Sequence, residues 1–269
     1  MSASPYATDL QLALQRDEFF LEFQPQFDSH TGELCGAEAL LRWQHPLLGK
    51  TPPTAFIPEA ENSGLIRALG MWTLQQTLQA WQQMYHQTGR QMRMAVNVAF
   101  VEIADSDYAS RVLTLLQHHQ VPGHALELEL TETALLRKPT VSQANLQQLQ
   151  DSGIHIALDD FGTGYSSLSH LSDLPITGIK LDRSFVAPMA DNESQAHIVR
   201  SMLELAKRMK LETTAEGVED EHCLRLVQAL GCDRIQGFLY SAPLQLDTLI
   251  RYAQEGFPTS RDFYQHSLF

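Results

Sequence analysis

The feature that most constrains the fold is an alternation of short β-rich runs with helical patterns along nearly the whole chain. Strand–helix alternation predicts a parallel sheet, and eight such runs in 269 residues favour a closed α/β barrel of the TIM type. An open, doubly wound sheet is the alternative, but no G-x-G-x-x-G follows the first run. The runs are FFLEFQPQF, CGAEALLRW, RMAVNVA, LELELTE, IHIALDD, GIKLD, ETTAEG and RIQGF, ending near Phe27, Trp43, Ala99, Glu132, Asp160, Asp182, Gly217 and Phe238.

The first two runs depart from this alternation. Only the stretch from Asp28 to Glu33 separates them, which is too short for a crossover helix. They are therefore expected to pair as an antiparallel hairpin. The predicted fold is a modified TIM (β/α)8 barrel whose first strand is antiparallel.

Two segments between the runs have the periodicity of amphipathic helices. Apolar residues recur there at spacings of three and four, which predicts one face packed on the core. The first stripe is Met71, Leu74, Leu78, Trp81 and Tyr85, and the second is Ile198, Met202, Leu205 and Met209.

The size and composition fit one domain spanning residues 1–269, with its core from about residue 9 to residue 250. Apolar residues make up 43 % and charged residues 19 % of the chain, which suits a globular core. Neither a long apolar run nor a signal-peptide pattern is present, so we expect no membrane segment. Three scattered cysteines, Cys35, Cys223 and Cys232, suggest a reducing cytoplasm and no disulfide framework.

The net charge of −13 limits the possible partners. Such a surface repels DNA and RNA polymers, so no nucleic-acid polymer is expected to bind. The same charge suits cation binding if several carboxylates converge. Solubility alone is the commoner reason for an acidic surface.

Polar residues lie at or near the C-terminal end of almost every predicted strand. In a barrel these ends share one rim, and active sites are built on that rim. Residues far apart in sequence would then meet in one pocket. The set is Glu38, Asn97, Glu129, Asp159, Lys180, Glu216 and Gln236.

The convergent residues are mostly oxygen donors. Neither His-x-x-x-His nor Cys-x-x-Cys occurs, and all-oxygen ligation selects Mg²⁺ or Mn²⁺ over zinc. Two cations about 4 Å apart would explain why two aspartates are adjacent, because one can bridge while the other completes the second site. The expected ligands are Glu38, Asn97, Glu129, Asp159, Asp160 and Glu216.

Each of these residues also has an ordinary interpretation. Asp159-Asp160 before Gly-Thr-Gly fits an Asx turn or a helix cap. Lys180 could be a surface lysine, and Gln236 an ordinary polar strand end. A kinase-like Asp-Phe-Gly is disfavoured because no glycine-rich loop or His-Arg-Asp accompanies it. Glu127 shares a strand face with Glu129 but lies deeper, and the sequence indicates no partner for it.

The motifs together resemble the EAL family of cyclic di-GMP phosphodiesterases. The resemblance covers residues from about 9 to 250, and the order and spacing of its motifs are specific. They are EALLRW (residues 38–43), FIPEAENSGLI (56–66), VNVA, LELELTET, DDFGTGYSSL, IKLDRSFV (179–186), AEGVED (215–220) and QGFLYSAPL (236–244).

The resemblance implies roles for particular residues. Glu38, Asn97, Glu129 and Asp159 match the ligands of one metal, and Asp159, Asp160 and Glu216 those of a second. Lys180 matches the lysine beside the attacking water, and Glu216 has also been assigned as general base. The catalytic set would be Glu38, Lys180, Glu216 and Asp160. Substrate or neighbouring positions would be Gln24, Leu40, Arg42, Asp182 and Gln236, and Glu132 would anchor the loop that follows the aspartate pair.

The implied activity is hydrolysis of cyclic di-GMP to linear pGpG in a bacterial cytoplasm, with two Mg²⁺ or Mn²⁺ ions. The family also implies a homodimer, and its members often carry sensor or diguanylate cyclase domains. Alternatives are a non-catalytic cyclic di-GMP receptor, a protein-interaction module on the same fold, or another metal-dependent phosphodiesterase. The residues after Asn97 depart from the family pattern at Ala99 and Glu102, where serine and glutamine are usual. Neither change removes an expected metal ligand.

Overall fold

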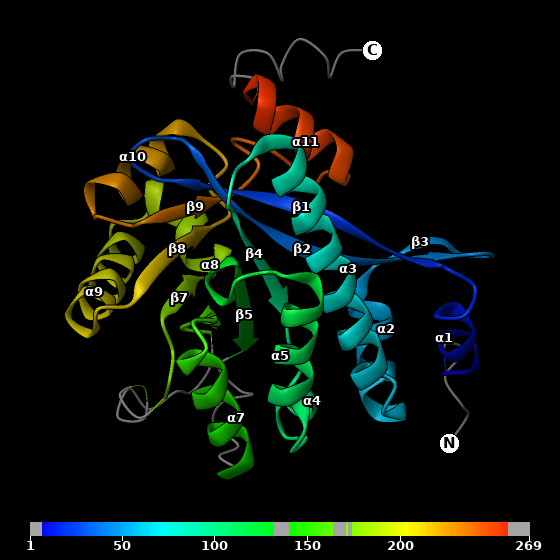
Figure 1. Ribbon diagram of the computed structural model, residues 1–269. Coiled ribbons are helices and arrows are strands. Elements are labelled where there is room, and N and C mark those ends of the chain that lie inside the picture. Colours follow the sequence, from blue (N-terminus) through cyan, green and yellow to red (C-terminus); the bar gives the residue numbers. More distant parts are fainter. Residues whose placement is uncertain (1–6, 132–139, 164–170, 172–173, 258–269) are drawn as a thin grey trace.

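The strands form one sheet that closes on itself into a barrel (Figure 1). A computed structural model describes residues 7–131, 140–163, 171 and 174–257. The sheet order is β1-β9-β8-β7-β6-β5-β4-β2-β3, and pairing of β1 with β2 closes the barrel. The strands are β1 (Phe19–Asp28), β2 (Leu34–His45), β3 (Gly49–Thr51), β4 (Arg93–Asn97), β5 (Leu126–Thr131), β6 (His155–Phe161), β7 (Gly178–Leu181), β8 (Glu212–Glu216) and β9 (Arg234–Gln236).

Strand β1 is antiparallel to both of its barrel neighbours, β2 and β9, whereas the pairs from β2–β4 to β8–β9 are parallel. The β1–β2 turn explains this direction. Asp28 accepts hydrogen bonds from the backbone N–H groups of His30 and Thr31, and Gly32 takes a φ of 70° to reverse the chain. The predicted modified TIM barrel is confirmed.

Strand β3 was not predicted from the sequence. The long strand β2 continues past the barrel, and its last residues pair antiparallel with β3, with Trp43 opposite Thr51. This extension points away from the barrel in Figure 1. Leu47 in its turn is 89 % exposed. Three residues of strand give too little alternation to be recognised in a sequence.

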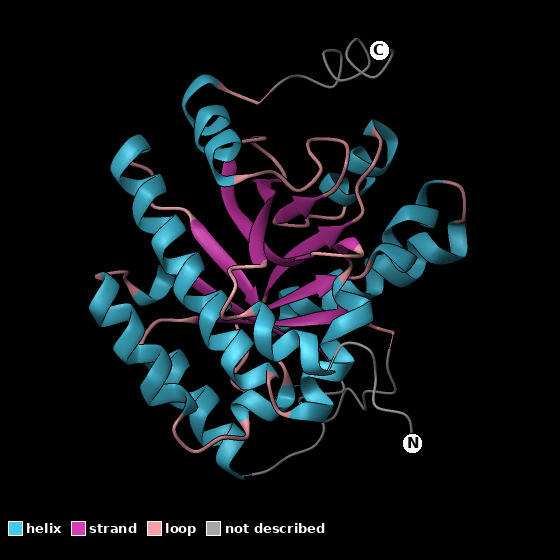
Figure 2. Cartoon of the chain, turned by 90° about the vertical axis from the view of Figure 1, so that its right-hand side faces the viewer, coloured by secondary structure: helices cyan, strands magenta, loops and turns pink. Residues whose placement is uncertain are grey.

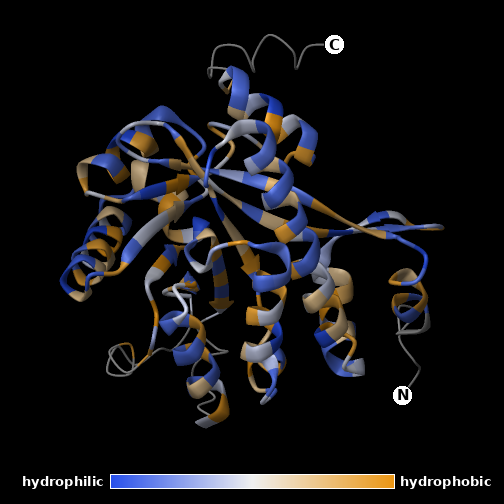
Figure 3. Ribbon diagram, viewed as in Figure 1, coloured by the Kyte–Doolittle hydropathy of each residue, from blue (hydrophilic) through white to orange (hydrophobic). Residues whose placement is uncertain are grey.

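Helices surround the strands, as Figure 2 shows, and Figure 3 shows that they carry both hydrophilic and hydrophobic residues. The stripe predicted for α3 is largely confirmed, since Leu74, Leu78 and Trp81 are buried. The α-helices are α1 (Ala7–Ala13), α2 (Pro53–Ser63), α3 (Ile66–Thr88), α4 (Phe100–Ile103), α5 (Tyr108–His119), α7 (Thr140–Asp151), α8 (Arg183–Val186), α9 (Glu193–Met209), α10 (Glu221–Ala229) and α11 (Leu246–Glu255), with 3-10 turns η1 (Gly123–Ala125) and η3 (Ala187–Ala190).

The stripe predicted for α9 is partly wrong. Its most buried residues are Val199, Leu203 and Ala206, while Ile198 is 42 % exposed. Met202, with the two apolar residues that follow it in the stripe, packs only at the edge of the core. The buried face is rotated by about one residue from the predicted stripe, because apolar residues form two adjacent stripes on this helix and tertiary packing decides which one faces the strands.

The barrel interior is polar, and the main core lies between the strands and the helices. On β5 the alternation is complete: Leu126, Leu128 and Leu130 are fully buried in the outer core, whereas Glu127 and Glu129 belong to the other face and are 1 % exposed. Both glutamates therefore point into the barrel lumen. In the described ranges, no helix combines the length and apolar character needed to cross a membrane.

Candidate active site at the C-terminal mouth of the barrel

Lys180 lies at the centre of the predicted carboxylates. Its Nζ is 2.7 Å from Glu216 Oε1, 2.8 Å from Glu129 Oε2 and 3.3 Å from both Glu38 Oε2 and Asp159 Oδ1. The lysine is 1 % exposed, so the reading of Lys180 as a surface side chain is wrong. Residues from β2, β5, β6, β7 and β8 thus meet at the mouth where the parallel strands end, and Glu38 reaches it from the middle of β2, which continues past the barrel.

Two side-chain amides hold the Glu38 carboxylate in place. Asn97 Nδ2 donates to Oε1 at 2.7 Å, and Gln236 Nε2 donates to Oε2 at 2.6 Å. Asn97 is the last residue of β4 and lies opposite Glu129 in the parallel register, which brings the two together. Because the nitrogen of Asn97 binds Glu38, the amide oxygen on the other side remains the atom suited to a cation.

A local distortion lets Asp159 and Asp160 serve the same mouth. In a regular strand, neighbouring side chains point to opposite faces. Here the β6–β7 register shifts between Leu158 and Phe161, and Asp160 has a φ of 54°. Carboxylate oxygens of Asp159, Asp160 and Glu216 consequently lie within 4.8 Å of one another. Aspartate tolerates this left-handed conformation better than most residues.

Burial and repulsion raise the pKa of several of these acids. Desolvation and the Glu38 charge raise the pKa of Glu129 well above its ordinary value. Burial raises the pKa of Glu216 to about 7, although Lys180 opposes the effect. The pKa of Asp160 is raised by burial and by the charge of Asp159. The positive charge near these carboxyl groups is too small to offset burial and mutual repulsion, so their pKa values rise.

Glu38 and Lys180 shift toward their charged forms. Burial by itself raises the pKa of Glu38, but Lys180 and the donors Gln236 and Asn97 bring it below its ordinary value. Burial favours the neutral amine of Lys180, yet the surrounding carboxylates, led by Glu129, raise its pKa well above the ordinary value. The carboxylates around Lys180 therefore favour its ammonium form.

The donor set fits hard divalent cations. Among the described residues, the buried side-chain atoms without a hydrogen-bond partner include Glu129 Oε1, and also Asp159 Oδ1, which has only the Lys180 ammonium at 3.3 Å. An orphaned buried carboxylate oxygen is costly, and a bound cation would remove that cost. Every donor is an oxygen, as Mg²⁺ and Mn²⁺ require. Glu38, Asn97, Glu129, Asp159, Asp160 and Glu216 are thus able to hold such ions.

Two cavities flank the carboxylates. One of about 280 Å³ is lined by Gln24, Glu38, Asp159, Glu216 and Gln236, together with Arg183, Gly217, Glu219, Gly237 and Phe238. The other, of about 930 Å³, is bounded by residues of β2, α2 and α3 and reaches Asn97 and Glu129. The acidic cluster lies between them, so an extended ligand could cross it.

The predicted substrate residues differ in their surroundings. Gln24 and Gln236 are hydrogen-bonded at 3.1 Å beside Glu38, and Leu40 and Arg42 line the larger cavity. The Arg42 Nε also donates to Glu22 at 2.7 Å.

Two other predicted residues lie apart from this group. Asp182 caps α8 by accepting the N–H of Ser184, and its charge reaches Asp160. Glu132, predicted to anchor a loop, lies outside the described residues.

A second polar cluster, at the N-terminal mouth, contains the partners of Glu127 that the sequence did not indicate. Its Oε2 accepts from Arg93 Nη1 at 3.0 Å and from Arg234 Nη2 at 2.8 Å. Both guanidinium groups also reach Glu212. Sequence reasoning missed Arg93 and Arg234, although both begin predicted strands, where they face the opposite mouth from the active site. Glu127, Glu212 and His155 lie close enough to hold a metal, but the arginines already supply the positive charge.

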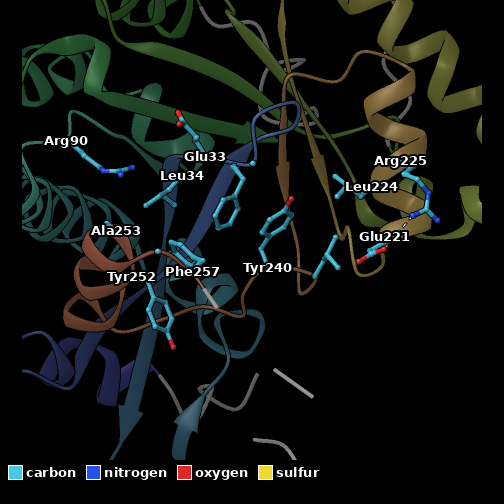
Figure 4. A pocket seen from close by; sticks show the side chains of 14 residues that line it. Glu33, Leu34, Arg90, Glu221, Leu224, Arg225, Tyr240, Tyr252, Ala253 and Phe257 are labelled. Carbon is cyan, nitrogen blue, oxygen red and sulfur yellow. Dashed lines mark ion pairs between the residues drawn. The ribbon is translucent and has the colours of Figure 1, made fainter. Parts of the chain in front are cut away.

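A third cavity, of about 580 Å³, is separate from the acidic cluster (Figure 4). Its wall is aromatic, with Tyr240 stacked on Phe27 at 4.4 Å and Phe257 edge-on to Phe27 at 4.8 Å. Arg225 pairs with Glu221 on its rim at 3.6 Å. It shares no lining residue with the carboxylate site.

The comparison with known families agrees with this geometry. A family model described as "EAL domain" matches residues 7–243. The chain belongs to the EAL domain family. Glu38, Ala39 and Leu40 are the residues of the EAL motif, and Glu38 is the one that enters the acidic cluster.

Relatives and solved structures give the same family. A Pseudomonas aeruginosa protein named cyclic di-GMP phosphodiesterase PA2567 is 37 % identical over 91 % of this chain and 42 % of its own length. A Synechocystis protein described as uncharacterized is 38 % identical over 92 % of this chain and 36 % of its own. The EAL chain thus spans about two fifths of the length of these curated relatives.

Two solved EAL structures superpose well. One described as "PaMucR Phosphodiesterase, c-di-GMP complex" has a TM-score of 0.85 and 36 % identity, and covers 90 % of this chain and 98 % of its own. Another, EAL enzyme Bd1971 in a cAMP- and cyclic-di-GMP-bound form, has a TM-score of 0.88 and 30 % identity over 92 % of this chain and 68 % of its own.

Proposed function

We propose that this chain is a metal-dependent phosphodiesterase that hydrolyses cyclic di-GMP to linear pGpG. The observation that carries the proposal is the cluster of buried carboxylates around Lys180, with orphaned oxygens, between two cavities. The name of the Pseudomonas relative and the cyclic di-GMP complex of the MucR domain support the same substrate.

Six residues would hold two divalent cations: Glu38, Asn97, Glu129, Asp159, Asp160 and Glu216. When bound, Mg²⁺ or Mn²⁺ supplies an acidified water and neutralises charge on the phosphoryl oxygens. The chain's own contribution is to keep these donors in one place before the ions arrive. Asn97 and Gln236 fix Glu38, and the bulge in β6 turns Asp160 toward Asp159 and Glu216.

Lys180 is assigned a positioning and electrostatic role. The surrounding carboxylates raise its pKa, which favours the ammonium form. Its ammonium group can donate hydrogen bonds to a water or phosphoryl oxygen at the cluster while it offsets one of the carboxylates. Among the four carboxylates that face Lys180, the Glu216 side chain is the most exposed, at 19 %.

The cavities suit a ligand with two bases and a phosphate between them. Leu40 and Arg42 line the larger cavity, while Gln24 and the exposed ring of Phe238, 57 % accessible, line the smaller one. Aromatic rings and amides can stack on bases or hydrogen-bond to them, and Arg42 can contact phosphate. Asp182, near Asp160 at the same mouth, would contribute to the substrate side of the site.

The alternatives from another class are a non-catalytic cyclic di-GMP receptor and a protein-interaction module. Either would be favoured by missing metal ligands, and every expected ligand position is present in this sequence. A receptor would bind the nucleotide tightly and leave it intact for hours.

The test is turnover by the purified chain with Mg²⁺ or Mn²⁺, with pGpG measured by anion-exchange chromatography. Wild type should linearise cyclic di-GMP, and a Glu38→Ala variant should lose more turnover than the roughly 10- to 100-fold that removing a partner behind a metal ligand costs. Glu204→Ala, at an exposed position on α9, is the matched control. Full activity of Glu38→Ala would refute the metal assignment.

Other features of the proposal need their own measurements. We expect a homodimer, and activity measured against protein concentration, alongside sedimentation, tests it. The length of the relatives leaves room for sensor or diguanylate cyclase domains in a longer protein. We predict a cytoplasmic location, because Cys35, Cys223 and Cys232 are free thiols.

A further inference from the structure

A row of buried side chains connects the two polar clusters through the barrel lumen. Arg234 Nη1 donates to Gln26 Oε1 at 3.2 Å, and Gln26 Nε2 donates to Gln236 Oε1 at 2.9 Å. Gln236 Nε2 then donates to Glu38 Oε2 at 2.6 Å and to Gln24 Oε1 at 3.1 Å. Gln26 is fully buried and Gln236 is 4 % exposed, so water does not compete for these bonds.

The direction of every bond in this row is set by its two ends. Arg234 has only donors, and the ionised Glu38 has only acceptors. Gln26 must therefore turn its oxygen to Arg234, which leaves its NH₂ group for the oxygen of Gln236. The NH₂ group of Gln236 must then face Glu38. Reversing either amide would place two donors or two acceptors against each other.

The outer end of the row is firmly anchored. Arg234 Nη2 donates to Glu127 at 2.8 Å and to Glu212 at 3.1 Å, and Arg234 is 5 % exposed. Space for the Gln26 amide depends on Gly36, its partner across the β1–β2 ladder. A methyl group at Gly36 would lie 3.0 Å from Gln26 Oε1.

We infer that Gln26 is a positioning residue for the metal ligand Glu38, acting through the orientation of the Gln236 amide. This inference rests on the proposed metal-dependent function. With Gln26 in place, Glu38 receives Asn97 on one oxygen and Gln236 on the other, so the carboxylate is oriented before a cation binds. Partners behind a metal ligand usually change metal affinity by about 10- to 100-fold when they are removed.

The decisive variant is Gln26→Glu. A carboxylate at this position still accepts from Arg234, so the outer anchor survives, but it cannot donate to Gln236. The Gln236 amide is then expected to rotate so that its NH₂ group donates to residue 26. The amide oxygen of Gln236 would then face Glu38. Gln26→Met, of similar volume, removes the amide without reversing it and should have the smaller effect.

The primary readout is Mn²⁺ binding to the chain without nucleotide, by titration calorimetry. Gln26→Glu should weaken Mn²⁺ binding by at least about tenfold, with Gln26→Met between it and wild type. In turnover, the Mn²⁺ concentration for half activity should rise equally, and saturating Mn²⁺ should restore most of kcat. A merely structural role would lower kcat at every metal concentration. Gln79→Glu, at an exposed position on α3, is the matched control and should bind Mn²⁺ like wild type.

Wild-type protein provides a test that needs no variant. Titration with Mg²⁺ should shift the side-chain amide NMR signals of Gln236 and Gln26 together, while that of Gln82 stays in place. Wild-type Mn²⁺ affinity in folded Gln26→Glu or Gln26→Met, or an unmoved Gln26 signal, would overturn the inference. Because these readouts need no substrate, they stand apart from the activity test: an inactive chain that passes them loses the proposed function but keeps the positioning role.

Discussion

Replacing Glu102 by glutamine should make the protein less sensitive to alkaline pH. Glu102 is at the third position of α4 and is 3 % exposed. Its Oε2 accepts the backbone N–H of Ala99 at 2.9 Å, and its carboxyl group lies against Gly70 of α3, where a methyl group could not fit. Burial raises its pKa from an ordinary 4.5 to about 8, and Arg111 offsets only part of this.

The direction of the effect follows from proton linkage. The folded state holds the Glu102 proton up to a pH of about 8, whereas the unfolded chain releases it above 4.5. Folding therefore binds a proton between these values, so the free energy of unfolding falls as the pH rises through this window. The contribution is intact below pH 4.5 and lost above pH 8.

The magnitude follows from the two pKa values. They differ by about 3.5, and at about 1.4 kcal/mol for each pKa unit the ionised carboxyl costs about 5 kcal/mol at pH 9. At pH 7 the cost is about 3 kcal/mol by the same relation. Glutamine keeps the oxygen acceptor for Ala99 and cannot ionise, so Glu102→Gln should remove this cost.

The assay is urea unfolding followed by circular dichroism at pH 5, 7 and 9, without divalent cations. Wild type and Glu102→Gln should have similar unfolding free energies at pH 5, and the variant should be more stable by an amount that grows toward pH 9. Glu204→Gln, an exposed position on α9, is the control and should show no such growth. A difference between Glu102→Gln and wild type that is constant across the three pH values would refute the reasoning.

Three further substitutions test the two mouths of the barrel. Glu127→Gln should lower the free energy of unfolding by about 3–5 kcal/mol, because Arg93 and Arg234 lose a buried counter-charge; a urea-measured loss below about 1 kcal/mol would contradict this. Asp160→Gly should raise the melting temperature by about 2–4 °C, since glycine adopts the φ of 54° without strain, while turnover is lost; an active variant would exclude Asp160 from the metal site. Lys180→Met removes the ammonium group among the carboxylates, so the stability of the folded state should depend more strongly on bound Mn²⁺. The rise in melting temperature on adding Mn²⁺ should therefore exceed that of wild type. An equal rise would show that Lys180 does not offset the carboxylates.

The barrel and most residues of its C-terminal mouth could be predicted from the sequence, because both depend on local patterns. Strand alternation, the short β1–β2 connection and the polar residue at each strand end are all visible in one dimension. Asp160 shows the limit of such patterns. Adjacent aspartates in a strand should face opposite ways, and only the left-handed φ at Asp160 brings both to one mouth.

Contacts across the lumen could not be predicted from spacing. Gln26 is two residues from Gln24 and therefore on the same strand face, which was an available signal that it points inward. Its partners, Arg234 and Gln236, are about two hundred residues away, and the sequence does not reveal which arginine reaches which acid. The partner of Glu127 was missed for the same reason.

The two mouths of the lumen differ in their charge balance, and that difference indicates which one is functional. At the N-terminal mouth two acids face two arginines, so their formal charges cancel. At the C-terminal mouth five carboxylates, counting Asp160, surround the single ammonium of Lys180. If all are ionised, the formal charge is −4, which two divalent cations would neutralise. Without such ions, burial and mutual repulsion raise the pKa of Glu129 and of Glu216, which favours their protonated forms.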